Sequence, residues 1–178
     1  MKKNLLIMSL LINTHLSYGF SSGAPICEVF AEFDNITGMT NRLRNSNPGD
    51  YTVTSNVSEY NVFEHVELTI SGPTFIGLMF TVVDSNGNNV GMFSPDSQVD
   101  NCNGNAMSIT HSQSLGLITK TLFWIPPENL VGNVYIEGYV LSGVSGNIPS
   151  QSFYRFVRDD LSALELTESD VLFLNGFD

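Results

Sequence analysis

Alternating apolar and polar residues predict β-strands along most of the chain. Over residues 62–70, one face carries Val62, Val66, Leu68 and Ile70. This period of two is typical of a half-buried strand. Phe75–Val83 is apolar on both faces, as expected of a central strand. Asp84-Ser85-Asn86-Gly87 then supplies turn residues before Asn89–Phe93, so these two runs are expected to form a hairpin.

The same pattern recurs in the second half of the chain. Leu117–Ile125 and Val134–Leu141 are expected strands, separated by Pro126-Pro127, and Phe153–Val157 is expected to be the last strand. Only Ser162–Ser169 has a helical pattern, and that pattern is weak. Many short strands punctuated by turns favour an all-β fold, an antiparallel β-sandwich.

The first residues are typical of a secretory signal peptide. Lys2 and Lys3 precede an apolar run, residues 5–12, that is shorter than a membrane-spanning helix needs, and Ser17-Tyr18-Gly19 offers small residues for cleavage. We therefore expect residues 1–19 to be removed and the mature protein to be secreted, extracellular or at the cell surface. The alternative is an uncleaved membrane anchor. No later run has the length and apolarity to span a membrane.

The chain is strongly acidic. It has 7 basic and 18 acidic residues and a formal net charge of -11, and the leader would remove two of the lysines. The negative electrostatic potential of such a protein repels nucleic acid, anionic lipid and sulfated glycans. We therefore expect no nucleic-acid partner.

Two cysteines, Cys27 and Cys102, lie outside any close-spaced metal motif. In an exported protein they would meet an oxidising compartment, which favours a disulfide. Two free buried thiols are the alternative. On the chain-entropy model, a bridge over a loop of this length contributes about 4 to 5 kcal/mol to stability.

A series of short motifs gives the chain a family resemblance. The motifs are Ser22-Gly23-Ala24-Pro25 with Cys27, Phe75-Ile76-Gly77 through Asp84, Gly91-Met92-Phe93, Cys102, Thr110-His111-Ser112 after Ala106, Lys120, Trp124-Ile125-Pro126 and Gly132-Asn133-Val134-Tyr135. In this order and spacing, residues 20–158 resemble the reeler domain, the module at the N-terminus of reelin and the spondins and in small secreted insect defence proteins.

The resemblance implies an immunoglobulin-like antiparallel β-sandwich of about seven to nine strands with one disulfide, Cys27–Cys102. Two features depart from the family. The loop Glu28–Asp50 lacks the usual methionine, proline and histidine-rich sequence, and the acidity of the chain does not fit the glycosaminoglycan affinity of some members. Heparin binding is therefore not carried over.

The residues that could support catalysis are better explained as structural. Thr110, His111 and Ser112 put a histidine beside two hydroxyls, but neighbouring residues of a strand point to opposite faces, so His111 could not easily activate Ser112. A triad also needs an orienting acid and an oxyanion hole. The sequence has no nucleophile elbow, phosphate loop or dinucleotide fingerprint. We therefore predict that the protein is not an enzyme.

We predict no metal and no cofactor. His65 and His111 are far apart in sequence, which disfavours a zinc site. Asp84, with Asn86 and Asn88, resembles the start of a calcium loop, but the required glycine and glutamate are replaced by Asn89 and Pro95, and a hairpin turn explains these residues better. A weaker calcium site made by Asp96, Asp100 and residues 101–103 is an alternative that the sequence leaves open.

Aromatic residues carry the binding hypothesis. Trp124 is expected in the core and Pro126 at the end of its strand, with surface recognition by Trp124 as the alternative. Tyr135, Tyr139 and Tyr154 fall on strand faces opposite apolar residues, where they could contact a protein or a sugar. The alternative is that they are ordinary solvent-facing strand residues.

Residues 159–178 are expected to be an acidic linker followed by a short apolar tail. The tail ends in Asn175-Gly176-Phe177-Asp178, which resembles short tails on exported bacterial proteins and suggests a bacterial member of the family. The alternative is a final edge strand or a frayed end.

These observations predict a secreted, non-enzymatic recognition or adhesion module whose partner is an extracellular protein or glycan. Because the adhesion part rests on analogy of fold, two alternatives stay open. One is an extracellular defence-type effector, and the other is a metal-dependent enzyme activity in the loops around His111 and Asp84.

Overall fold

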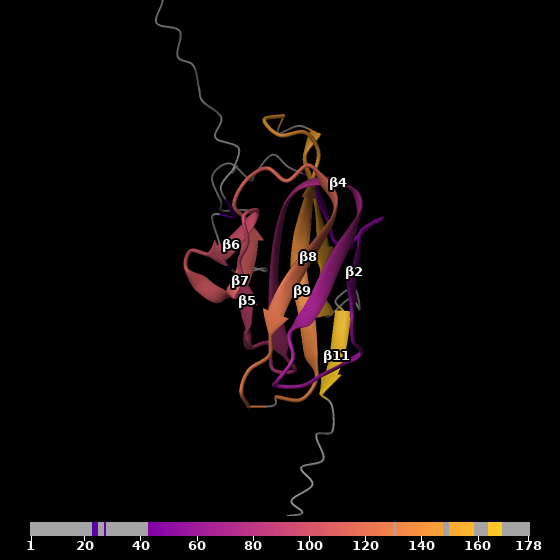
Figure 1. The fold of residues 1–178 in the computed structure, drawn as a ribbon. Coiled ribbons are helices and arrows are strands. Elements are labelled where there is room, and N and C mark those ends of the chain that lie inside the picture. The colour runs from indigo at the N-terminus through magenta and orange to yellow at the C-terminus, as the bar shows by residue number, and fades with distance from the viewer. Residues whose placement is uncertain are drawn as a thin grey trace, which may run out of the picture.

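In the part of the chain that the structure describes, every regular secondary-structure element is a β-strand. The computed structural model describes residues 23–24, 27, 43–129, 131–147, 150–158 and 164–168. Eleven strands lie in these ranges (Figure 1). They are β1 (Leu43–Asn45), β2 (Thr52–Ser55), β3 (Glu59–Tyr60), β4 (Val66–Asp84), β5 (Met92–Ser94), β6 (Val99–Cys102), β7 (Asn105–His111), β8 (Leu117–Ile125), β9 (Val134–Ser142), β10 (Ser152–Phe156) and β11 (Leu164–Glu168). The expected all-β fold is confirmed.

The long strand β4 organises the fold. Its first half pairs antiparallel with β2 and β8, and its second half pairs antiparallel with β7 and β9. The register shifts between Ser71 and Phe75, where the strand passes from one layer to the other. The two runs that the sequence suggests as separate strands, 62–70 and 75–83, therefore belong largely to one strand.

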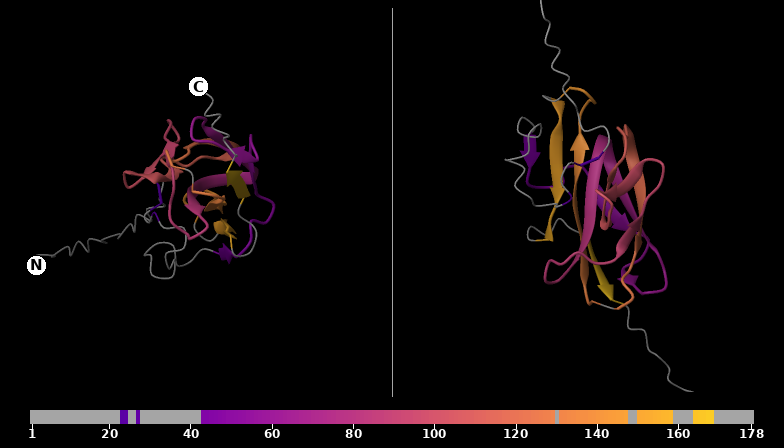
Figure 2. Two further views of the ribbon diagram at one scale, coloured as in Figure 1. Left: turned by 90° about the horizontal axis from the view of Figure 1, so that it is seen from below. Right: turned by 90° about the vertical axis from the view of Figure 1, so that its left-hand side faces the viewer.

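The strands form two layers, seen side by side in the right-hand view of Figure 2. One layer contains β2, the first half of β4, β8 and β5. The other has the order β1-β10-β9-β4-β7-β6, with β11 also paired to β9. Most pairs are antiparallel, but β1 with β10 and β3 with β11 are parallel. The expected sandwich is confirmed, with eleven strands in place of seven to nine.

The main core fills the space between the layers. Its buried side chains come from most of the strands and include Trp124, Leu68, Phe80, Ile136 and Phe156. The alternation in β8 places Leu122 and Trp124 inward and Phe123 outward. Burial of these large side chains supplies the main hydrophobic stabilisation of the fold.

A second, smaller cluster lies on the opposite face of the β9–β4 layer. We call it the outer cluster, and it consists of Ala24, Ile76, Met79, Cys102, Tyr139, Leu141 and Phe153, with Cys27 packed against it. The Cys27–Cys102 disulfide, with Cα atoms 5.5 Å apart, ties the N-terminal segment to the end of β6 beside this cluster. The expected disulfide is confirmed.

The expected hairpin after β4 forms only at its turn. Val83 makes a bridge to Asn89, and the amide of Val90 donates to the Val82 carbonyl. The chain then leaves β4, and β5 pairs with β8 in the other layer. Gly91 permits this crossing because it has φ +67° and because a Cβ there would overlap the indole of Trp124.

The chain after residue 158 differs from expectation. Leu164–Glu168 is strand β11, not a helix, and it pairs with β9 and β3. Leu166 is buried in the main core, so the folded domain extends beyond residue 158. The predicted leader, most of the loop 28–50 and the apolar end of the tail lie outside the described residues, and the predictions about them stay predictions.

Candidate functional site

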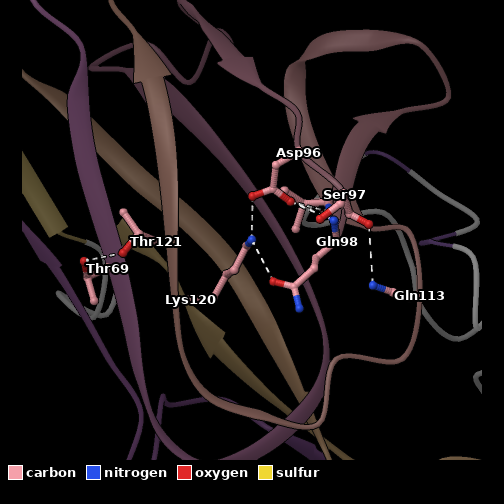
Figure 3. Close-up of polar contacts among 8 residues, drawn as sticks. Thr69, Asp96, Ser97, Gln98, Gln113, Lys120 and Thr121 are labelled. Carbon is pink, nitrogen blue, oxygen red and sulfur yellow. Dashed lines mark hydrogen bonds and ion pairs between the residues drawn. The ribbon is translucent and has the colours of Figure 1, made fainter.

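Lys120 is a buried charged residue on the inward face of β8. It shares that face with Leu122 and Trp124, and only 8% of its surface is exposed. Its amine donates to the Asp96 carboxylate at 2.6 Å and to the Gln98 side-chain oxygen at 3.2 Å (Figure 3). A buried lysine needs such partners to offset the loss of hydration.

Asp96 organises the loop between β5 and β6. Its second carboxylate oxygen accepts from the amides of Gln98 at 2.7 Å and Val99 at 3.1 Å. Burial alone would raise the pKa of Asp96, but these amides and Lys120 outweigh it and lower that pKa. The carboxylate is thus already held by the protein in its charged form, and the Lys120–Asp96 pair fastens this loop to the end of the sandwich.

His111 is buried against β4. Its Nδ1 lies 3.1 Å from the carbonyl oxygen and 3.2 Å from the amide nitrogen of Leu78, so either tautomer finds a partner there. A Cβ on Gly77 would lie 2.8 Å from the imidazole ring, which explains the glycine in the Phe75-Ile76-Gly77 motif. The imidazole therefore packs between strands, as a structural histidine does.

The hydroxyl of Thr110 ties the N-terminal segment to β4. It accepts from the Ala24 amide at 2.8 Å and donates to the Leu78 carbonyl at 3.1 Å. Ser112 lies just past the end of β7, where its amide donates to the Gln98 carbonyl. The motif Thr110-His111-Ser112 thus joins three parts of the chain by hydrogen bonds.

Trp124 and Pro126 lie where the sequence places them. Trp124 is fully buried in the main core, its indole nitrogen donates to the Val90 carbonyl at 3.1 Å, and its ring packs edge-on against Tyr60. Pro126 is buried directly after the last residue of β8. The disulfide belongs to the outer cluster, so Trp124 does not share its surroundings.

The three candidate tyrosines do not form one surface. The expectation for Tyr139 is wrong: it is 2% exposed and packs edge-on against Phe153 in the outer cluster. This face of β9 contributes to the outer cluster, to which Ala24 and Phe153 also belong. Tyr154 packs on Tyr51 at the border of the main core. Tyr135 is half-buried, with its hydroxyl 3.3 Å from Glu165.

The candidate calcium residues Asp84 and Asp100 accept hydrogen bonds from nearby groups, Asp84 at the turn after β4 and Asp100 within β6. The Asp84 carboxylate accepts from the amides of Asn86 and Asn88 and from the Asn88 side chain. Led by the Asn88 side chain, these bonds lower the pKa of Asp84. Asp100 accepts from the amide of Asn101 at 2.7 Å. Among the described residues, no three His, Cys, Asp or Glu side chains come together as metal ligands.

Exposed apolar side chains are the feature that sequence reasoning missed. Phe63, Met92 and Phe123 are 74%, 49% and 39% exposed. Phe123 alternates with the buried Leu122 and Trp124, and this alternation was the available signal for an outward-facing aromatic residue.

Comparisons with known proteins agree with this architecture. The family model described as the Reeler domain matches residues 36–145. No curated protein matches the chain. The described residues include no helix with the length and apolarity to cross a membrane.

Solved structures show the same fold. The human F-spondin reeler domain (fragment 1) is 16% identical, with a TM-score of 0.56 over 72% of this chain and 96% of that chain. A second fragment of the human domain gives 18% identity and a TM-score of 0.57 over 71% and 92% of the two chains. The Reelin-N domain of F-spondin gives 18% and 0.56 over 73% and 94%. With the match of the family model, these observations place the chain in the Reeler domain family.

Proposed function

We propose that the protein is a secreted, non-enzymatic recognition or adhesion module that binds an extracellular protein or glycan. Reeler domains are an extracellular domain type, which supports the location. The observation that carries the non-enzymatic part is that the candidate chemical groups serve the fold. Lys120 is bound to Asp96 and Gln98, and His111 is packed against Leu78.

The geometry around His111 argues further against catalysis. A general base must reach the proton that it removes, within hydrogen-bond distance or through one water. His111 is 4% exposed and lies against the backbone of β4, so a substrate has little access to its ring. A binding module needs only an accessible surface, and the outward faces of the strands provide one.

The proposal is tested by presenting the oxidised protein to arrays of extracellular proteins and glycans. We expect saturable binding to at least one of them, with the bound ligand unchanged by mass spectrometry. The heat-denatured protein is the control and should not bind. Failure to bind any ligand would overturn the proposal, and so would turnover of a ligand that disappears in a folded His111→Ala variant.

A further inference from the structure

One part of the outward face of the β5–β8–β4 layer is apolar. In the strand register, Phe123 lies between Ser94 of β5 and Glu67 of β4, and Met92 lies opposite Ile125. Met92 and Phe123 are thus diagonal neighbours on adjacent strands, close enough for long side chains to touch. We call this region the Phe123 face, and it consists of Met92, Phe123, Ile125 and Glu67.

The rest of the same outward face has a different character. Thr69 pairs with Thr121 and Ser71 with Thr119, and their hydroxyls lie 3.2 and 3.3 Å apart. These hydroxyl groups satisfy one another and face water at little cost. Exposed strand positions of this layer therefore tolerate hydroxyl residues well, yet Met92 and Phe123 are large and apolar.

The composition of the Phe123 face is that of an interface. Aromatic residues and methionine are enriched in protein–protein interfaces relative to other surface. Phe63, which is 74% exposed, lies three residues before the start of β4, and Val66 at that start pairs with Trp124. A third large apolar side chain thus emerges close to this end of the layer.

The charges around the Phe123 face are negative. Glu67 is exposed directly opposite Phe123, and Glu64 is exposed just before β4. His65 is the other exposed ionisable group at this strand start. On β2, β4, β5 and β8, the one basic side chain is Lys120, which points inward to Asp96. The Phe123 face therefore has carboxylates that no cation of these strands neutralises.

We infer that the Phe123 face binds a cationic amphipathic segment of a partner protein. Apolar side chains of the segment would cover Met92 and Phe123, and its Lys or Arg side chains would approach Glu64 and Glu67. A second copy of this chain fits poorly, because two molecules of net charge -11 repel each other. This inference rests on the proposed recognition function and names its surface and partner chemistry.

The test uses synthetic amphipathic helices as probes. The oxidised protein is titrated with a leucine and lysine helix, with a leucine and glutamate helix of the same apolar pattern, and with a serine and lysine helix of the same charge. Only the leucine and lysine helix should bind tightly. Its affinity should fall when ionic strength rises from about 0.05 to about 0.5 M, because salt screens exposed charges.

Matched variants assign the site. Met92→Thr with Phe123→Thr should weaken binding of the leucine and lysine helix about tenfold or more, since truncation of central aromatic contacts commonly costs this much. Ile118→Thr, which removes an exposed apolar residue from the other end of β8, should change little. Glu67→Gln should weaken binding more than Asp50→Asn, which changes the net charge equally. Each variant must retain the melting temperature of the parent to be compared.

The outcomes separate this inference from the proposed function. Equal binding by the Met92→Thr, Phe123→Thr protein and the Ile118→Thr protein overturns the inference, as does equal binding of the acidic helix. If array ligands still bind the Met92→Thr, Phe123→Thr protein, the recognition function stands, but the Phe123 face is not the binding surface. If the parent protein binds no array ligand, the recognition function itself fails.

Discussion

The two apolar clusters of the domain are buried by different means. The main core is enclosed between two hydrogen-bonded layers, so its burial follows from strand pairing. The outer cluster lies on the far side of one layer, where the N-terminal segment at Ala24 and Cys27 covers it. That segment is tied by the disulfide, by the Ala24 amide to Thr110, and by the hydroxyl of Ser108 to the Cys27 carbonyl.

The two clusters therefore differ in the interactions that stabilise them. A strand inside a sheet holds its neighbours through many backbone hydrogen bonds, whereas a covering segment is held by a few. At the outer cluster, the Cys27–Cys102 disulfide, and not a ladder of backbone hydrogen bonds, is the main link that holds the covering segment. The main core should therefore respond to changes of side-chain volume, and the outer cluster to changes of the disulfide.

The largest expected effect is in the main core. Trp124→Ala removes a fully buried ring and leaves the Val90 carbonyl without its indole donor. The free energy of unfolding should fall by about 3 to 5 kcal/mol, measured by urea denaturation. Phe123→Ala, the next residue on the outward face, is the control and should cost far less. Similar losses in the two variants would contradict the assignment of the main core.

Removal of the disulfide should have an effect of similar size. Replacing Cys27 and Cys102 with serine should lower the free energy of unfolding by about 4 to 5 kcal/mol, because the unfolded chain is no longer constrained. Amide hydrogen exchange should accelerate more in β6 and β7, beside the outer cluster, than in the β4–β8 pair. Uniform acceleration would show that the two clusters are not separately held. A reducing agent should destabilise the parent and leave the serine variant unchanged.

A moderate effect is expected at Lys120, the polar residue at the border of the main core. Lys120→Met removes the hydrogen bonds to Asp96 and Gln98. Because the Asp96 side chain is 40% exposed, water can replace the lost partner, and the cost should be about 1 to 2 kcal/mol. Ile118→Met, on the same strand but exposed, is the matched control. A loss as large as that of Trp124→Ala would mean that Lys120 anchors more than one loop.

The smallest expected effect is a pH dependence set by turn carboxylates. The pKa values of Asp84 and Asp96 are lowered below 3.8 in the folded protein. Their stabilisation is therefore complete above about pH 4 and is lost as pH falls through the folded-state pKa values. Urea midpoints should drop between about pH 4 and pH 2, and this drop should be shallower in a protein with Asp84→Asn and Asp96→Asn. An unchanged slope would contradict the role of these turns.

Sequence periodicity predicted the strands that pair regularly. Residues 117–125 form β8 with the expected bounds, and 134–142 form β9. The continuity of β4 was not predictable, because Gly72 and Pro73 suggest a break. In the structure, both lie where the ladder with β8 is interrupted, so the missing amide hydrogen of proline costs no ladder bond.

The missed site features depend on contacts between distant segments. The pairing of Lys120 with Asp96 joins residues of different elements, and no local pattern reports it. Tyr139 is buried in the outer cluster with residues of other segments, such as Phe153 and Ala24, and periodicity within β9 cannot reveal this. In β11, Leu164 and Leu166 alternate with Glu165 and Thr167, a strand signal that a weak helical pattern concealed.

The shared strand β4 has a consequence for how the protein is made. The second half of β4 is among the most apolar parts of the chain, and its partners β7 and β9 follow it in sequence. Because the chain is synthesised from its N-terminus, the second half of β4 is made before β7 and β9. Its backbone N–H and C=O groups stay unpaired until both of these strands have been made. A nascent chain with such an edge is prone to aggregate. Rapid synthesis of residues 85–142, or a chaperone that covers β4 meanwhile, should therefore set the yield of folded protein.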